Sequence, residues 1–188
     1  MKIIESRFYA ALMVITDYFL LGLLWLLTSL PLITIFHSTS ALFSVIKQWQ
    51  KGNTGDILKY YFSSFKQQFG LKFIVFIFYL LCMSVIYLDF SVLSRELITD
   101  KFSIVGLMTA LLILIAGFVQ MALIDMTTKK YKITEFFKLG ALTVVRQFSH
   151  SIYYMLLIIG LAFSVLWFPF SMLILVPLVA KLICLKSS

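Results

Sequence analysis

The sequence predicts an all-α protein: a polytopic membrane helical bundle of about five transmembrane helices, with amphipathic helices at the cytoplasmic interface. Three observations support this fold class. Of the 188 residues, 62% are hydrophobic and only 13% are charged, whereas a soluble domain carries about 25% charged residues. Apolar runs long enough to cross about 30 Å of hydrocarbon recur along the chain. The basic residues gather in the segments between these runs.

The apolar runs define the predicted spans. They cover residues 17–36, 71–92, 103–124, 151–168 and 170–185. Only Phe168-Pro169-Phe170 separates the last two, so they form either a tight helical hairpin or one long broken helix. We expect residues 1–188 to make one integral-membrane domain.

The charges of the connecting segments predict the orientation, because Lys and Arg favour the cytoplasmic side. Segment 37–72 carries five lysines against one aspartate, a net charge of +4. Segment 125–150 carries five basic against two acidic residues, a net charge of +3. The loop between the second and third spans is neutral. Both long basic loops, 37–72 and 125–150, are therefore predicted to be cytoplasmic.

Each basic loop also holds phenylalanines at helical spacing, which predicts an amphipathic helix. This common pattern is compatible with a parallel repeat of residues 17–92 and 103–168, followed by a final span at 170–185. It is equally compatible with two unrelated interfacial loops. We expect the apolar faces to contact a partner: Trp49, Leu58, Phe62, Phe65, Lys66, Phe69, Phe137 and Phe148. We expect the neighbouring lysines to contact anionic lipid head groups: Lys47, Lys51, Lys59, Lys129, Lys130 and Lys132.

The end of the first span predicts a kink followed by a bend. Pro31 removes a helical hydrogen bond, and Ser38 is placed to cap a following helix whose apolar stripe would lie at the interface. The predicted bend residues are Pro31, Thr34, His37, Ser38 and Ser40. Two interpretations remain open. The bend lines a polar cavity, or it simply turns a membrane helix into a surface helix.

No motif predicts a reaction. The sequence contains no GxSxG, no HExxH and no P-loop. The two histidines and two cysteines are isolated from one another. We therefore expect no catalytic residue, cofactor or metal site, no nucleic acid as a partner, and a protein that is not an enzyme. Asp17, Asp89 and Asp125 fall near span boundaries and are interpreted as interfacial, whereas Gln120 should face other helices.

Small residues recur at helix-contact spacing in two spans, which allows close approach of backbones in a membrane. They are Gly106 with Ala110, and Gly160 with Ser164. These pairs either close this bundle or receive another subunit.

Several segments near the N-terminus carry a resemblance. Ser29-Leu30-Pro31-Leu32-Ile33-Thr34 forms a proline–threonine step, Ser38-Thr39-Ser40-Ala41-Leu42 a small-residue bend, and Phe62-Ser63-Ser64-Phe65-Lys66-Gln67-Gln68-Phe69 an FFxSFKxNF-like run. In these segments the chain resembles the YesL-like family of small bacterial multi-span membrane proteins. It departs from that family's pattern at Phe36-His37, where members commonly show a Gly-Ala-like pair, and at Gln68, where they favour Asn.

The YesL-like family has no established catalytic activity and is associated with carbohydrate uptake in Gram-positive bacteria. The resemblance therefore implies a multi-pass protein of the bacterial cytoplasmic membrane. It would act as a non-catalytic accessory or partner of a carbohydrate ABC importer and bind the importer's permease subunits. The alternative is a small autonomous transporter or channel whose path is lined by the bend from Pro31 to Ser40.

Overall fold

The computed structural model describes residues 2–53, 55–95, 101–125 and 131–187. Within these ranges every regular element is helical, which confirms the predicted all-α class. The elements are α1 (Lys2–Ser29), the 3-10 helix η1 (Leu32–Thr34), α2 (Ile35–Gln50), α3 (Ile57–Lys66), α4 (Phe69–Arg95), α5 (Lys101–Asp125), α6 (Ile133–Arg146), α7 (Phe148–Trp167), the 3-10 helix η2 (Pro169–Ser171) and α8 (Met172–Ser187).

Five stretches of the described helices are long and apolar enough to cross a membrane. They are Leu12–Ser29, Phe69–Ser91, Val105–Asp125, Ser149–Trp167 and Pro169–Lys186. Because most of their side chains are not buried within the chain, they suit hydrocarbon rather than a protein core. The chain is thus built as a multi-pass membrane protein.

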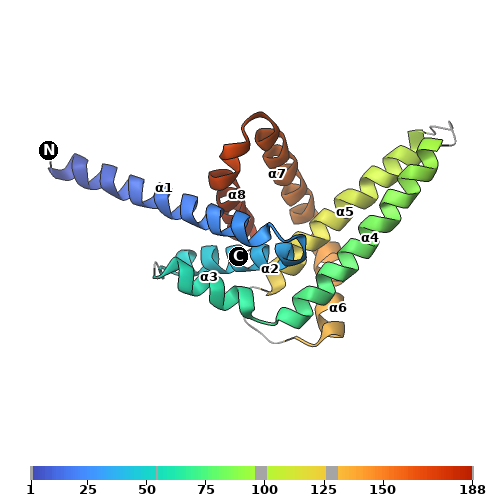
Figure 1. The fold of residues 1–188 in the computed structure, drawn as a ribbon, viewed down its shortest axis with the longest axis horizontal. Helices are drawn as coiled ribbons and strands as arrows, with labels where there is room; N and C mark the ends of the chain where they lie inside the picture. Colours follow the sequence, from blue (N-terminus) through green and yellow to red (C-terminus); the bar gives the residue numbers. More distant parts are fainter. Residues whose placement is uncertain (1, 54, 96–100, 126–130, 188) are drawn as a thin grey trace.

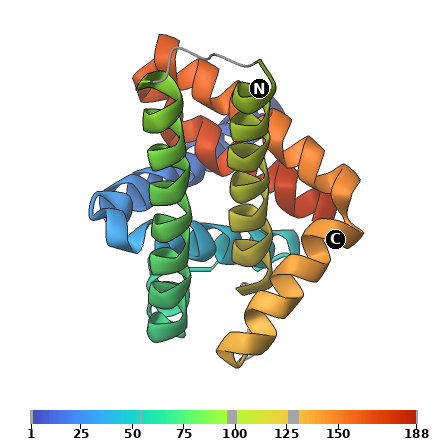
Figure 2. The same cartoon turned by 90° about the vertical axis from the view of Figure 1, so that its right-hand side faces the viewer.

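The spans form two helical hairpins and a separate first helix (Figure 1). Helices α4 and α5 lie side by side in both views (Figures 1 and 2). Helices α7 and α8 form a tight hairpin through η2, which decides between the two predicted arrangements of residues 151–185. Helix α1 extends away from the α4–α5 hairpin. Helices α2, α3 and α6 lie at the end where α4 begins and α5 finishes, so both long basic segments share one end of the molecule.

Helix α2 is the centre of the fold, not a surface helix. The prediction of an interfacial α2 is therefore wrong. Its side chains Phe36, Ala41 and Leu42 are at most 1% exposed, and it contacts α1, α3, α4, α5 and α8. Small residues such as Ser40 and Ala41 let neighbouring helices approach from several sides. An apolar stripe alone cannot distinguish a helix on a bilayer from one buried among four spans.

The predicted kink at Pro31 is also wrong, because the proline ends the span instead of bending it. Helix α1 finishes at Ser29 and the exposed Pro31 precedes η1. A residue before proline is disfavoured in helical conformation, so Leu30 cannot continue α1. The Thr34 hydroxyl secures the turn by donating to the carbonyl oxygens of Thr28 and Pro31.

The predicted cap at Ser38 is also wrong, because Ser38 lies inside the helix and not at its start. Helix α2 already begins at Ile35, and Ser38 lies in its first turns. The Ser38 hydroxyl donates to the Thr34 carbonyl oxygen at 2.9 Å, an ordinary bond back along the helix.

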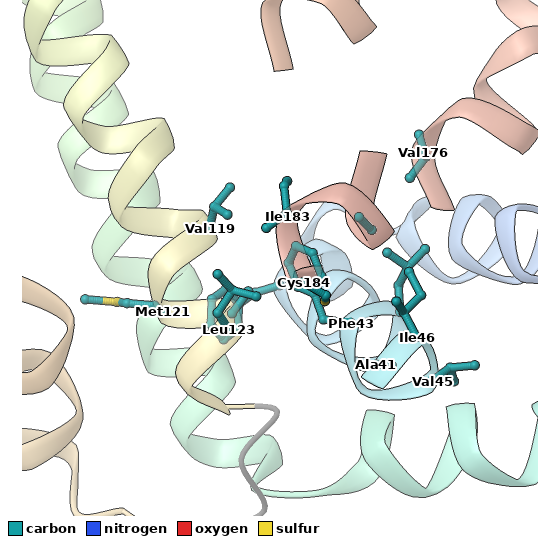
Figure 3. Packing of buried hydrophobic residues seen from close by; sticks show 14 of the residues in the cluster. Ala41, Phe43, Val45, Ile46, Val119, Met121, Leu123, Val176, Ile183 and Cys184 are labelled. Carbon is teal, nitrogen blue, oxygen red and sulfur yellow. The ribbon is translucent and has the colours of Figure 1, made fainter. Parts of the chain in front are cut away.

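The core packs α5 against different neighbours on different sides. In Figure 3, Val119 on α5 points toward Ile183 on α8, whereas Met121 extends in the opposite direction toward α6. There Met121 meets Gly140, where an added Cβ would lie 2.8 Å from the methionine methyl carbon. Helix α5 therefore joins α6 to the central helices.

Of the glycines in the described chain, Gly22 lies closest to a neighbouring helix. A Cβ at this position would lie 1.8 Å from the Leu173 carbonyl oxygen, so the backbones of α1 and α8 touch. At Gly106 and Gly160, by contrast, an added Cβ would meet nothing within 4 Å. The predicted pairs Gly106–Ala110 and Gly160–Ser164 thus do not close this bundle. Their alternative role, receiving another subunit, stays a prediction.

We expect Gly22→Ala to separate α1 from α8, because the methyl group would meet backbone that cannot rotate away. The expected cost is about 1–3 kcal/mol, seen as a lower thermal unfolding midpoint of the detergent-purified protein. Gly106→Ala is the matched control and should leave the midpoint unchanged or slightly raised, since alanine favours the helix. Equal midpoints for the two variants would contradict the close contact.

Candidate functional site

A buried ion pair lies where the central helix meets the α4–α5 hairpin. The ammonium Nζ of Lys72, in the first turns of α4, is 3.1 Å from Oδ2 of Asp125, the last residue of α5. The Lys72 and Asp125 side chains are 1% and 6% exposed. An antiparallel hairpin brings these two positions together, because the start of one span faces the end of the next.

Two further hydrogen bonds connect this ion pair to neighbouring helices. The Ser40 hydroxyl of α2 donates to Oδ2 of Asp125. The Lys72 ammonium donates to the Ser64 carbonyl oxygen at 2.6 Å. Ser64 lies in the last turn of α3, where carbonyls lack their usual helical partner and attract cations. The group of Ser40, Ser64, Lys72 and Asp125, here called the buried polar cluster, joins α2, α3, α4 and α5.

A sharp turn between α3 and α4 brings the Lys72 side chain close to the Ser64 carbonyl oxygen. The predicted amphipathic segment from Leu58 to Phe69 is not one helix, because α3 ends at Lys66 and α4 begins at Phe69. Gln68 adopts a φ of 50° between them, a conformation that is uncommon for residues other than glycine. The chain therefore turns sharply, and Phe69 belongs to a different helix from Phe62.

His37 lies beside the buried polar cluster. Its Nε2 is 3.2 Å from the Phe69 carbonyl oxygen, and because a carbonyl can only accept, Nε2 carries the proton. The ring packs against Phe69 and Phe65, with centroids 4.3 and 5.6 Å apart. Nδ1 is buried and has no hydrogen-bond partner among the residues that the structure describes.

The surroundings of His37 keep its imidazole neutral. Burial lowers the pKa of His37 below its ordinary value of 6.5, and the nearby charge of Lys72 lowers it further. The hydrogen bond to Phe69 and the charge of Asp125 act in the opposite direction. Burial is the largest of these effects.

A second polar contact attaches α3 to α1. The Tyr61 hydroxyl lies 2.5 Å from the Thr28 hydroxyl, and Tyr61 is fully buried. Burial raises the pKa of Tyr61 to about 12, so the phenol stays protonated and can donate. Ile57, Tyr61 and Phe65 form the inward face of α3, since positions four apart share one side of a helix.

The chemistry available to the buried polar cluster is structural. The Ser40 hydroxyl donates to a carboxylate and is 1% exposed, so it faces no substrate. Lys72 is held by two oxygens. Within the described ranges, no three His, Cys, Asp or Glu side chains are grouped to hold a metal ion. What the cluster does is fix four helices relative to one another.

The predicted bend residues separate in the structure. His37 and Ser40 lie at the buried polar cluster, whereas Thr34 and Ser38 donate to nearby backbone carbonyls and Pro31 is exposed. Ser38 also forms a side-chain hydrogen bond with Tyr61 of α3.

The predicted partner face separates as well. Leu58, Phe62, Lys66 and Phe69 are exposed. Trp49, Phe65 and Phe137 are half-buried against the core. The side chain of Phe148 lies outside the described residues.

The predicted lipid-contacting lysines are mostly accessible. Lys51, Lys59 and Lys132 are exposed, and Lys47 is half-buried. Lys129 and Lys130 lie outside the described residues. Contact with head groups stays a prediction for all of them.

Sequence analysis missed the ion pair itself. Lys72 was counted among the loop charges, and the interpretation of Asp125 as an interfacial carboxylate is wrong, because Asp125 is buried. A signal was present: an ionisable residue inside a span is costly and calls for a partner. Lys72 lies three residues after Phe69, where the apolar run of α4 starts, at the level where α5 ends.

Comparisons with known proteins add one similarity. A family model described as "Protein of unknown function, DUF624" matches residues 18–90. No curated protein and no solved structure matches the chain. The matched segment contains Ser40, Ser64 and Lys72 of the buried polar cluster, whereas Asp125 lies beyond it. The similarity therefore covers α2, α3, most of α4 and the C-terminal part of α1, and its description states no activity.

The ion pair should behave as a coupled unit in a double-mutant cycle. Lys72→Met or Asp125→Leu alone leaves one uncompensated buried charge and should cost about 3–5 kcal/mol. The double variant should recover much of that loss, because two apolar side chains need no partner. Unfolding free energies in detergent measure the cycle.

The exposed Lys66→Met serves as the control and should change stability little. Additive losses in the double variant would contradict the coupling of Lys72 with Asp125.

His37 should make stability depend on pH. The fold keeps His37 neutral, whereas the unfolded chain takes up a proton near pH 6.5. The unfolded state therefore binds more protons below that pH, and stability falls as the pH drops from about 6.5 toward the lower pKa of the fold. We expect the unfolding midpoint to decrease between about pH 7.5 and about pH 5.5.

His37→Gln keeps a donor for the Phe69 carbonyl but does not titrate, so its midpoint should change less over the same range. An identical pH dependence in both proteins would assign the effect to other groups.

Proposed function

We propose that this protein is a non-catalytic subunit that acts by binding a partner membrane protein. One observation carries the proposal. The polar groups of the buried polar cluster bond to one another, whereas apolar and small residues such as Phe62 and Gly106 are left exposed by the described part of the chain. What the fold offers to other molecules is therefore surface, not a reactive site.

The first such surface is the outward side of α3. Leu58 and Phe62 are 50% and 42% exposed, and they share one face of the helix because they are four residues apart. Lys59 and Lys66 flank them and are also exposed. A phenylalanine-centred patch with a basic border can contact a partner's apolar groove while its lysines contact anionic head groups.

The second surface lies within the spans. Gly106, Ala110 and Gly160 are exposed, and no described neighbour covers either glycine. Small residues at this spacing allow a second helix to approach closely in a membrane. They are the intramembrane faces that a partner's spans would use.

The identity of the partner rests on the resemblance to the YesL-like family. That family is associated with carbohydrate uptake, so we propose the permease subunits of a bacterial carbohydrate ABC importer. The similarity over residues 18–90 includes α3 and its exposed patch, but its description names no partner.

The orientation follows the same proposal. The two basic segments lie at one end of the molecule (Figure 1), and basic loops favour the cytoplasm. We therefore place α2, α3 and α6 at the cytoplasmic end, in the bacterial cytoplasmic membrane.

A second candidate is an autonomous transporter or channel. One observation favours it, since Leu32, Ile35 and Thr39 of the bend do line a cavity. The walls of that cavity are apolar, however, and a sugar needs several hydrogen-bonding groups along its path. The partner role accounts better for these walls.

Replacing the exposed patch should release the partner without unfolding the protein. We expect the Leu58→Ser/Phe62→Ser variant to lose permease subunits that co-purify with the wild type in mild detergent, because buried aromatic anchors contribute most of the binding energy. Its thermal unfolding midpoint should stay close to the wild-type value, since both side chains face outward.

Phe163→Ser is the matched control, because Phe163 is 63% exposed on α7, away from α3. It should retain the partner. Purification of the wild type without any permease, combined with solute uptake by the protein alone in liposomes, would favour the transporter instead.

A further inference from the structure

An apolar cavity of about 540 Å³ lies between the two helical hairpins and the central helix. Its size falls in the range of about 300–1,000 Å³ that is typical of ligand sites. Helix α4 contributes Phe76, Tyr79, Leu80 and Met83 to one wall. These residues share one helix face, at positions i, i+3, i+4 and i+7.

The remaining walls come from helices distant in sequence. Helix α5 contributes a face from Leu114 to Val119, α7 contributes Ile158 and Leu161, and α8 contributes a face from Val176 to Ile183. Trp25 of α1, Leu32 of η1 and a face of α2 complete the lining. Val119, Val176 and Ile183 are seen in Figure 3, on α5 and α8.

The depth of the cavity places it in hydrocarbon. Phe76 lies seven residues after the start of the span Phe69–Ser91, and Met83 lies eight residues before its end. At 1.5 Å per residue these positions are about 10 Å from either end of the span. The wall residues of α5, α7 and α8 also fall inside their own spans.

The lining carries no charge and little unsatisfied polarity. Among its side chains only those of Trp25, Thr39 and Tyr79 bear polar atoms. The Trp25 indole N–H donates to the Thr39 hydroxyl at 3.3 Å, and that hydroxyl donates to the Ile35 carbonyl oxygen. A polar solute would lose its hydrogen bonds on entering such a cavity.

The shape of the lining argues against a helix as the occupant. Helix–helix contacts in membranes use small residues, whereas these walls are mostly Leu, Ile, Val, Phe and Met side chains. Such flexible, bulky side chains fit a thin hydrocarbon chain.

We propose that this cavity binds one acyl chain of a bilayer phospholipid, with the lipid head group remaining outside. The site depends on the arrangement of the helices and not on the proposed importer partner. The acyl chain would fill the space between the α4–α5 and α7–α8 hairpins and be retained when the protein is extracted.

Native mass spectrometry of the protein in mild detergent provides the test. The wild type should retain one phospholipid per chain. Ala180→Phe and Leu161→Trp place bulk in the cavity, since both residues line it, and each should abolish retention. Ala162→Phe and Leu156→Trp are the matched controls on α7. Ala162 is exposed and Leu156 is 65% exposed, and neither residue lines the cavity, so both variants should retain the lipid.

A second measurement uses the wild-type cavity and does not depend on the filled variants. Trp49→Phe/Trp167→Phe leaves Trp25 as the reporter in the cavity wall, and Trp25→Phe/Trp49→Phe leaves Trp167, which is 71% exposed. One equivalent of a phosphatidylcholine brominated on its acyl chains, added to delipidated protein in detergent, should quench Trp25 and leave Trp167 unchanged.

Three results would overturn the proposal: no retained phospholipid on the wild type, equal quenching of Trp25 and Trp167, or the same lipid loss in the controls as in the filled variants. Retention of a second protein chain in place of lipid, lost on Ala180→Phe, would also overturn it by assigning the cavity to a protein partner. Loss of permease binding in the patch variants would not affect these results, so failure of either proposal can be distinguished.

Discussion

The buried ion pair between Lys72 and Asp125 is the interaction on which the rest of the structure depends. Two charges removed from water are costly unless each is paired and hydrogen-bonded. Here the carboxylate also accepts from Ser40, and the ammonium also donates to the Ser64 carbonyl. The ion pair joins α4 to α5, and its two additional hydrogen bonds form only when α2 and α3 are also in place. The ion pair therefore favours one arrangement of the helices. Apolar contacts alone would not fix the helices relative to one another in lipid.

This constraint explains why α2 lies at the centre. The amphipathic sequence of α2 is also compatible with a helix on the bilayer surface. The hydrogen bond from Ser40 to Asp125 instead holds α2 inside the protein, where Phe36, Leu42 and Ile46 are buried. Once α2 is fixed, the hairpins α4–α5 and α7–α8 stand over it and diverge (Figure 1). The apolar cavity between them results from this divergence, because the charged contact holds α4 and α5 to α2 only at one end.

The same arrangement separates two kinds of surface. The polar groups of the buried polar cluster are hydrogen-bonded to one another inside the protein. Apolar groups, including Phe62 on α3 and the glycine faces of α5 and α7, are left for lipid or for a second protein. A partner protein at the outward surfaces and an acyl chain in the apolar cavity are therefore the two ligands that we propose.

Hydropathy and charge act locally along the chain, so the all-α class, the five spans and the shared end of the basic segments could be predicted from the sequence. The sequence also indicated that His37 and Ser40 are polar residues of one bend. The packing of the helices was needed to show that Ser40 bonds to Asp125, which is 85 residues away, and that Phe65 faces inward while Phe62 faces outward. It was also needed to show that Pro31 follows the end of a helix. Such pairings depend on which helices meet, and residues that are equally apolar do not encode that choice. The decisive information lay in two charges, Lys72 and Asp125, whose cost inside the protein only a specific contact could offset.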